Sequence, residues 1–156
     1  MSIVSVGKQF DERSVAGKPV ADRPEVDRPE VDELTVWGWV KAAVAAAEDG
    51  PGSNTVIINV GEVLSITGYF VITSGANSRA VRGLTEQVEE GVDAVGGPKP
   101  FSIEGKGQHE WVLMDYGDFV VHIFTAGARE YYALEQLWKD CPTLTADLPL
   151  PAAMAE

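Results

Sequence analysis

The chain has 156 residues, of which 45% are hydrophobic, so it is long enough to form one ordinary domain with a proper core. Its 24 acidic and 12 basic side chains give a formal net charge of −12. This balance argues against a protein that binds nucleic acid through phosphate contacts, which require clustered lysine and arginine. It suits a basic protein partner approached by electrostatic steering, although many acidic cytosolic proteins have no such partner.

Cysteine content and hydropathy point to the cytoplasm. Cys141 is the only cysteine, so no disulfide can form within the chain, which is compatible with a reducing compartment. No apolar run approaches the ~20 residues needed to span a bilayer. Residues 1–17 lack the basic start and the long apolar segment of a signal peptide. We therefore expect a cytoplasmic protein that does not enter membranes.

Residues 1–31 have the composition of a disordered extension. They contain the direct repeat D-R-P-E-V at residues 22–31, and its prolines favour extended backbone. Six of the 24 acidic and five of the 12 basic side chains lie in this segment, which leaves a net charge of −11 on residues 32–156. We expect the folded domain to occupy residues 32–145 and residues 146–156 to form a C-terminal tail.

The first predicted elements are a helix, two strands and a second helix. Residues 32–49 form the first helix, because valines recur every four residues and an alanine run has high helix propensity. Residues 54–60 and 66–75 are rich in β-branched side chains and predict strands. Asn77 or Ser78 can cap the next helix. Its apolar stripe has spacings of three and four residues: Val81, Leu84, Val88, Val92 and Val95.

The rest of the chain predicts three strands and a last helix. A short strand covers residues 100–105, and strands at 110–115 and 119–124 form a hairpin around a three-residue turn that contains Gly117. The last helix covers residues 128–140, and Pro142 bars its continuation. One side of this helix should pack against the rest of the domain. That side consists of Tyr131, Leu134, Leu137 and Trp138.

The order of these elements is α-β-β-α-β-β-β-α. It predicts a single α/β domain with a mixed, five-stranded sheet covered by helices. The hairpin supplies an antiparallel pair of strands. A strand–helix–strand unit through residues 69–105 would supply a parallel pair.

Asp115 and Asp118 are the candidates for catalysis. Enzymes that transfer nucleotidyl groups hold Mg²⁺ with carboxylates on adjacent strands, so a Mg-dependent nucleotidyltransferase-like enzyme using this pair is one hypothesis. It also needs a phosphate cradle, for which T-S-G-A-N-S at residues 73–78 is the one candidate, and a simple helix cap explains the same residues. Nothing matches a zinc, Walker or Rossmann pattern, so we expect no cofactor and no metal.

The remaining polar candidates favour structural roles. His122 alternates with apolar residues in a strand, which is more typical of a hydrogen-bonded core histidine than of a metal ligand. Cys141 has no base beside it in sequence and is interpreted as structural. By the period-two rule, Trp111 and Asp115 lie on one face of their strand and Tyr116 on the other. One of these faces should pack on helices, and the other is a candidate recognition surface.

Several segments together resemble the ribosomal silencing factors, also called Iojap-related proteins. The resemblance rests on W-V-L-M-D-Y-G-D-F-V-V-H-I-F (residues 111–124) and R-E-Y-Y-A-L-E-Q-L-W (129–138). Y-F-V-I-T-S-G-A-N-S-R (69–79) and E-G (104–105) match in order and spacing, and the resemblance covers about residues 34–145. L-W-K-D-C-P (137–142) is similar to actinobacterial members. Gly68 and Ala80 depart from the family pattern, where Asp and Gln are common.

The resemblance implies a fold similar to nucleotidyltransferases without their catalytic residues, and a function in translation. Members bind the fourteenth protein of the large ribosomal subunit, block association with the small subunit and lower translation when nutrients are scarce; many are homodimers. Carried over residue by residue, the partner-binding positions are Trp111, Asp115 and Tyr116. Further positions match the motifs without an assigned role: Asp118, His122, Arg129, Tyr132, Glu135, Leu137 and Trp138.

The leading hypothesis is therefore a translation repressor that is not an enzyme and that binds neither membranes nor nucleic acid directly. The Mg-dependent enzyme using Asp115 and Asp118 is the alternative. A dimeric scaffold without a ribosomal role is a third interpretation. Residues alone, without the resemblance, indicate only an acidic α/β domain with an aromatic hairpin.

Overall fold

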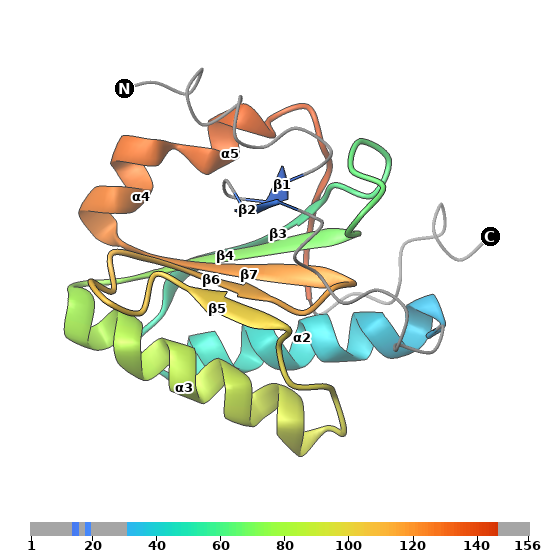
Figure 1. Ribbon diagram of the computed structural model, residues 1–156, viewed down its shortest axis with the longest axis horizontal. Helices are drawn as coiled ribbons and strands as arrows, with labels where there is room; N and C mark the ends of the chain where they lie inside the picture. The colour runs from blue at the N-terminus through green and yellow to red at the C-terminus, as the bar shows by residue number, and fades with distance from the viewer. Residues whose placement is uncertain (1–13, 16–17, 20–30, 147–156) are drawn as a thin grey trace.

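The computed structural model describes residues 14–15, 18–19 and 31–146. A six-stranded mixed sheet lies between two layers of helices (Figure 1). α2 (Glu33–Asp49) and α3 (Ser78–Ala94) cover one face, and the shorter α4 (Ala126–Tyr132) and α5 (Leu134–Leu137) lie over the other. The predicted class, a single α/β domain with a mixed sheet covered by helices, is confirmed. None of the described helices is long and apolar enough to cross a membrane.

The strand order in the sheet is β5-β6-β7-β4-β3-β8. The strands are β3 (Ser53–Asn59), β4 (Tyr69–Gly75), β5 (Ser102–Glu104), β6 (Trp111–Asp115), β7 (Phe119–Thr125) and β8 (Thr143–Leu144). Five strands were predicted, but the sheet has six, because the prediction missed the edge strand β8. Since β8 has two residues, it is too short for any periodicity in the sequence to mark it, and it exists only through its pairing with β3.

The predicted extension and tail lie largely outside the described residues. From the extension, the structure describes Val31 and one separate antiparallel pair, β1 (Ser14–Val15) with β2 (Lys18–Pro19). From the predicted tail, it describes Ala146, which packs against the core cluster under α2 and α3. The predictions for residues 1–31 and 146–156 therefore stay predictions.

The parallel pair of strands is not the one predicted. We expected β4 and the segment that became β5 to be neighbours, but β4 pairs in parallel with β7, from Tyr69 opposite Phe119 to Gly75 opposite Thr125. β5 lies at the sheet edge, antiparallel to β6. All seven residues of β4 are buried, which suits a central strand, whereas β5 has three residues and an exposed Glu104. The hairpin of β6 and β7 therefore inserts between the two strands that α3 connects.

Each of the two long helices begins after a capping residue, and Asn77 is one of the two caps predicted for α3. The side chain of Asp32 accepts a hydrogen bond from Thr35 N at 2.8 Å, and that of Asn77 accepts one from Ala80 N at 2.9 Å. Gly91 inside α3 has a packing reason, because a Cβ there would approach the Cβ of Ala46 in α2 to 2.8 Å. The predicted stripe of α3 is buried except for Val95, which lies beyond the helix end and is 55% exposed.

The last predicted helix is two helices. Ala133 adopts a left-handed conformation with φ 49°, which ends α4 and lets α5 start in a new direction. The turn brings Leu134 and Trp138 into the core cluster on this face of the sheet, where Trp138 meets Phe70 edge to face at 5.4 Å. It leaves Tyr131, which we expected on the packed side, 59% exposed.

Candidate functional site

The hairpin of β6 and β7 has the predicted three-residue turn, and its polar residues close that turn. Tyr116 N donates to the carbonyl of Phe119 at 3.0 Å, and Gly117 has φ 89°. The side chain of Asp115 accepts a hydrogen bond from Gly117 N at 2.9 Å. The D-Y-G sequence is therefore explained locally, because the aspartate holds the turn that the glycine permits.

Of the two carboxylates proposed for magnesium chemistry, Asp118 is half-buried in the turn, and its backbone carbonyl accepts a hydrogen bond from Gly68 N at 3.0 Å. Asp115 is 6% exposed and one of its oxygens bonds the turn. In the predicted phosphate cradle, Asn77 caps α3 and Ser74 accepts a hydrogen bond from Arg129. Within residues 31–146, no group of three His, Cys, Asp or Glu side chains is placed to hold a metal ion.

Tyr116 does not reach the surface. Its side chain is 0% exposed and belongs to the core cluster under α2 and α3. The ring stacks on Phe119 with 4.6 Å between centroids and 7° between planes. Burial, helped by the negative charge of Glu89, raises the pKa of its hydroxyl well above the ordinary value of 10.0. Tyr116 therefore lies on a face of the hairpin that packs on helices.

Trp111 lies at the start of β6 and keeps part of its side chain at the surface. Its indole Nε1 donates to Nδ1 of His122 in β7 at 3.1 Å. The indole ring stacks on Phe124, with 4.9 Å between centroids, and contacts the ring of Tyr132 in α4 at 4.7 Å. Three positions of the two signature segments are thus joined in one aromatic cluster that ties the hairpin to α4.

His122 is the hydrogen-bonded core histidine that the strand pattern predicted. It is 0% exposed, and because Nδ1 accepts from Trp111, the neutral ring carries its proton on Nε2. Its ring meets that of Phe70 edge to face at 4.6 Å. Burial lowers the pKa of the imidazole from 6.5 to about 3. The imidazole of His122 is therefore uncharged in the folded chain at neutral pH.

The burial of the His122 imidazole predicts how the free energy of unfolding changes with pH. Because its pKa is lower in the folded than in the unfolded chain, the unfolded chain binds the extra proton between pH 6.5 and about 3. The stability contributed by neutral His122 is complete above pH 6.5 and is lost as the pH falls. From pH 7.5 to 5.5 the wild type should lose about 1.4 kcal/mol more free energy of unfolding than His122→Phe. Urea unfolding of both proteins at both pH values measures this, and equal losses would contradict it.

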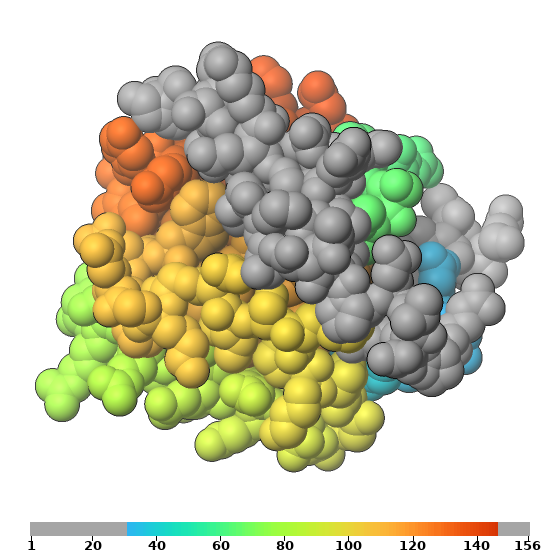
Figure 2. Space-filling view, in the orientation of Figure 1, coloured from blue at the N-terminus to red at the C-terminus, as the bar shows by residue number. Residues whose placement is uncertain are grey.

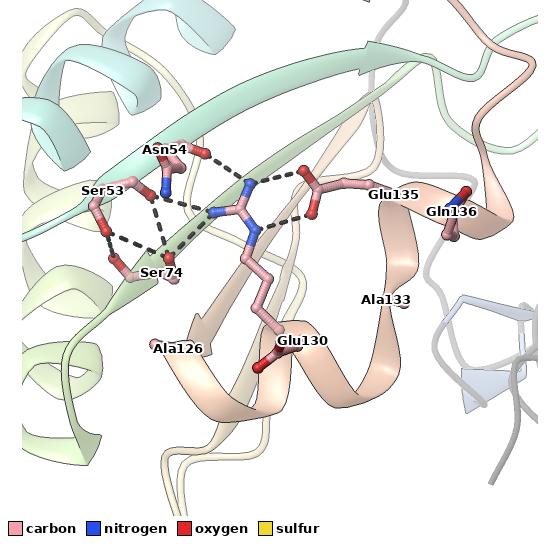
Figure 3. Close-up of a pocket in the computed structure, with 9 residues that line it drawn as sticks. Ser53, Asn54, Ser74, Ala126, Glu130, Ala133, Glu135 and Gln136 are labelled. Atoms are coloured by element: carbon pink, nitrogen blue, oxygen red, sulfur yellow. Dashed lines mark hydrogen bonds and ion pairs between the residues drawn. The ribbon is translucent and has the colours of Figure 1, made fainter.

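Arg129 in α4 donates five hydrogen bonds in a polar network at the ends of the strands (Figure 3). Its Nε and Nη2 donate to the two carboxylate oxygens of Glu135, each at 2.9 Å. Nη1 donates to the carbonyl of Ser53 and to Oγ of Ser74, both at 3.2 Å, and Nη2 donates to the carbonyl of Asn54 at 2.7 Å. These bonds join α4 and α5 to the ends of β3 and β4.

The network lines an open hollow of about 630 Å³ at the ends of these strands. The Arg129 side chain is 12% exposed, and its donors are engaged by the protein. Its charge is balanced by Glu135, so the hollow presents no unpaired cation of its own. The sequence marked both residues only as motif positions. Their separation of six does not match the three or four of a helical pair, and the left-handed Ala133 between them brings them together.

Comparison with known proteins identifies a family. Residues 35–155 match the family described as "Ribosomal silencing factor during starvation", RsfS. RsfS of Bacillus subtilis is 32% identical over 108 residues, which are 69% of this chain and 91% of that protein. RsfS of Chromobacterium violaceum is 35% identical over 103 residues, 63% of this chain and 80% of that protein. A mouse relative named "Mitochondrial assembly of ribosomal large subunit protein 1" is 32% identical over 84 residues, 53% of this chain and 37% of that protein.

Solved structures agree with these matches. A crystal structure from Bacillus halodurans superposes with a TM-score of 0.60 at 30% identity, covering 69% of this chain and 97% of that one. One from Chromobacterium violaceum has a TM-score of 0.63 at 28% identity, covering 77% and 100%. The family resemblance of the signature segments is thereby confirmed. The chain belongs to the family of ribosomal silencing factors.

Proposed function

We propose that this protein represses translation by binding the large ribosomal subunit. In this proposal it binds through the fourteenth protein of that subunit and sterically blocks association with the small subunit, especially when nutrients are limiting. The match to the RsfS family over residues 35–155 is the observation that carries it. The names of the relatives, which refer to silencing of ribosomes and to assembly of a large ribosomal subunit, support the same partner. The protein then acts by occupying a surface and not by catalysis.

The charge of the chain supports a basic partner. After residue 31 the chain carries 18 acidic and 7 basic side chains. Opposite charge accelerates encounter with a basic ribosomal protein, while buried aromatic contacts set how long the complex lasts. Raising the ionic strength should therefore slow association more than it speeds dissociation.

We place the anchor of the contact at Trp111. Of the three residues predicted to bind the partner, it is the one whose side chain is not buried. Asp115 and Tyr116 then act mainly by shaping the hairpin, since the first bonds the turn and the second packs beneath it. Rigid aromatic side chains that are partly exposed and held by neighbours are typical anchors of protein interfaces.

Replacing Trp111 by alanine should weaken binding to purified large ribosomal subunits by at least tenfold, about 1.4 kcal/mol. Co-sedimentation through sucrose measures the affinity, and circular dichroism selects preparations that remain folded. The matched control is Leu34→Ala, because Leu34 is 68% exposed at the start of α2, on the opposite face of the sheet. Equal affinities of the two variants would reject Trp111 as the anchor. A wild-type protein that does not sediment with large subunits would reject the function itself.

A further inference from the structure

Tyr131 is an exposed aromatic residue that neither the fold nor the predicted binding site uses. Four large hydrophobic side chains are exposed within residues 31–146, and Tyr131, at 59%, is the one aromatic among them. The other three, Leu34, Val63 and Val95, lie at the start of α2, in the β3–β4 connection and after α3. An exposed tyrosine combines apolar area with a polar tip, and it is a residue type enriched in protein interfaces.

The Tyr131 ring contacts a row of rings that leads to Trp111. It meets Tyr132 edge to face, with 5.0 Å between centroids and 87° between planes. Tyr132 in turn contacts Trp111 at 4.7 Å, and Trp111 stacks on Phe124 of β7. Figure 2 shows the golden surface of the segment that leads into and includes residues near the start of the hairpin next to the darker orange surface of α4. Tyr131 and Trp111 therefore belong to one continuous aromatic surface, which we call the aromatic edge.

The support beneath the aromatic edge is rigid on the α4 side as well. Arg129 precedes Tyr131 by two residues, and its hydrogen bonds fix α4 to the ends of β3 and β4. A ring held in its bound orientation before association loses little conformational entropy when a partner covers it.

The charges near the aromatic edge indicate which kind of side chain a partner would place there. Glu130 on α4 is exposed, and so is Glu110, whose carbonyl accepts a hydrogen bond from N of Thr125, the residue that caps α4. The cation of α4, Arg129, is paired with Glu135. An aromatic ring near exposed carboxylates suits a guanidinium group, which stacks on the ring and is neutralised by the carboxylates. A second copy of this acidic chain would bring like charges together.

We propose that Tyr131 is a second anchor of the partner-binding surface, which extends from Trp111 along α4 and receives an arginine-bearing segment of a basic protein. The proposal rests on the proposed function, because the ribosomal partner supplies that protein. It adds a binding residue outside the hairpin and states the kind of side chain that the residue contacts.

Three variants test the proposal by titration of purified large ribosomal subunits with labelled protein at two salt concentrations. Tyr131→Ala should weaken binding about tenfold, whereas Tyr131→Phe should stay within about twofold, because stacking needs the ring and not the hydroxyl. Val63→Ala is the matched control, since its side chain is 52% exposed in another part of the fold. Because Tyr131 is exposed, the variants should melt at the wild-type temperature.

A photo-reactive benzoylphenylalanine at position 131 identifies what covers this residue in the complex. A cross-link to a basic protein of the large subunit is the expected result. Cross-links only to ribosomal RNA or to a second copy of the chain would overturn the proposal, as would wild-type affinity of Tyr131→Ala. In those cases wild-type co-sedimentation would leave the proposed function standing. Failure of the wild type to bind large subunits would overturn both.

Discussion

Replacing Gly105 by alanine should lower the free energy of unfolding by about 3 kcal/mol, a large part of the stability of an ordinary domain. Gly105 follows β5 and has φ 92°, a conformation that side chains with a Cβ rarely adopt. A Cβ there would overlap the carbonyl oxygen of Trp111 and approach the carbonyl carbon of Trp111 to 3.0 Å. Both obstacles are backbone atoms of β6, so no side-chain rotation relieves them. The glycine of the E-G pair in the family signature thus has a steric cause.

Gly107 offers the matched control for this prediction. It lies two residues further along the same loop, and a Cβ added to it would meet nothing within 4 Å. Gly107→Ala should change stability by no more than about 0.5 kcal/mol. Urea unfolding followed by tryptophan fluorescence compares both variants with the wild type. Equal midpoints for Gly105→Ala and Gly107→Ala would contradict the steric explanation.

Replacing Arg129 by methionine should destabilise the fold by about 2–3 kcal/mol. Methionine keeps an aliphatic stem but has no guanidinium, so the carbonyls of Ser53 and Asn54 and the carboxylate of Glu135 lose their donor. Glu135 is 40% exposed and regains water, which limits the loss. Arg129→Lys should recover less than half of it, because a single ammonium cannot reproduce the planar, bidentate contact.

An exposed arginine is the control for this second prediction. Arg82→Met removes the same charge from the solvent-facing side of α3 and should change stability by no more than about 0.5 kcal/mol. Thermal unfolding of the variants at low and moderate salt separates the local network from general charge effects. If Arg129→Met and Arg82→Met shifted the melting temperature equally, the network would not contribute to stability.

Several features of the fold could be predicted from the sequence because they depend on residues that are close together along the chain. Asn77 caps α3 through a hydrogen bond to the residue three positions ahead. The turn at Gly117 likewise depends on a positive φ within a three-residue loop. The burial of His122 followed from its alternation with valine and phenylalanine in one strand. Signals of this kind need no information about distant parts of the chain.

The predictions that failed depend on packing between distant segments. β7 became the parallel neighbour of β4 because the hairpin inserts beside it, and β8 exists only by pairing with β3. The exposure of Tyr131 follows from the left-handed Ala133, which no helical periodicity anticipates. The same turn assembles the pair of Arg129 and Glu135. Long-range pairing and a single residue in an unusual conformation leave no periodic trace in a sequence.

By itself, the sequence determined the class of fold, the acidic charge, the capped helices and, through its signature segments, the family. The tertiary structure decided which of the signature residues can meet a partner. It buried Tyr116 under two helices, left part of Trp111 at the surface and joined it through Tyr132 to the exposed ring of Tyr131. The reason is physical: the residue types set the local conformation, while solvent exposure is a property of the assembled layers, since both faces of the hairpin are covered by helices.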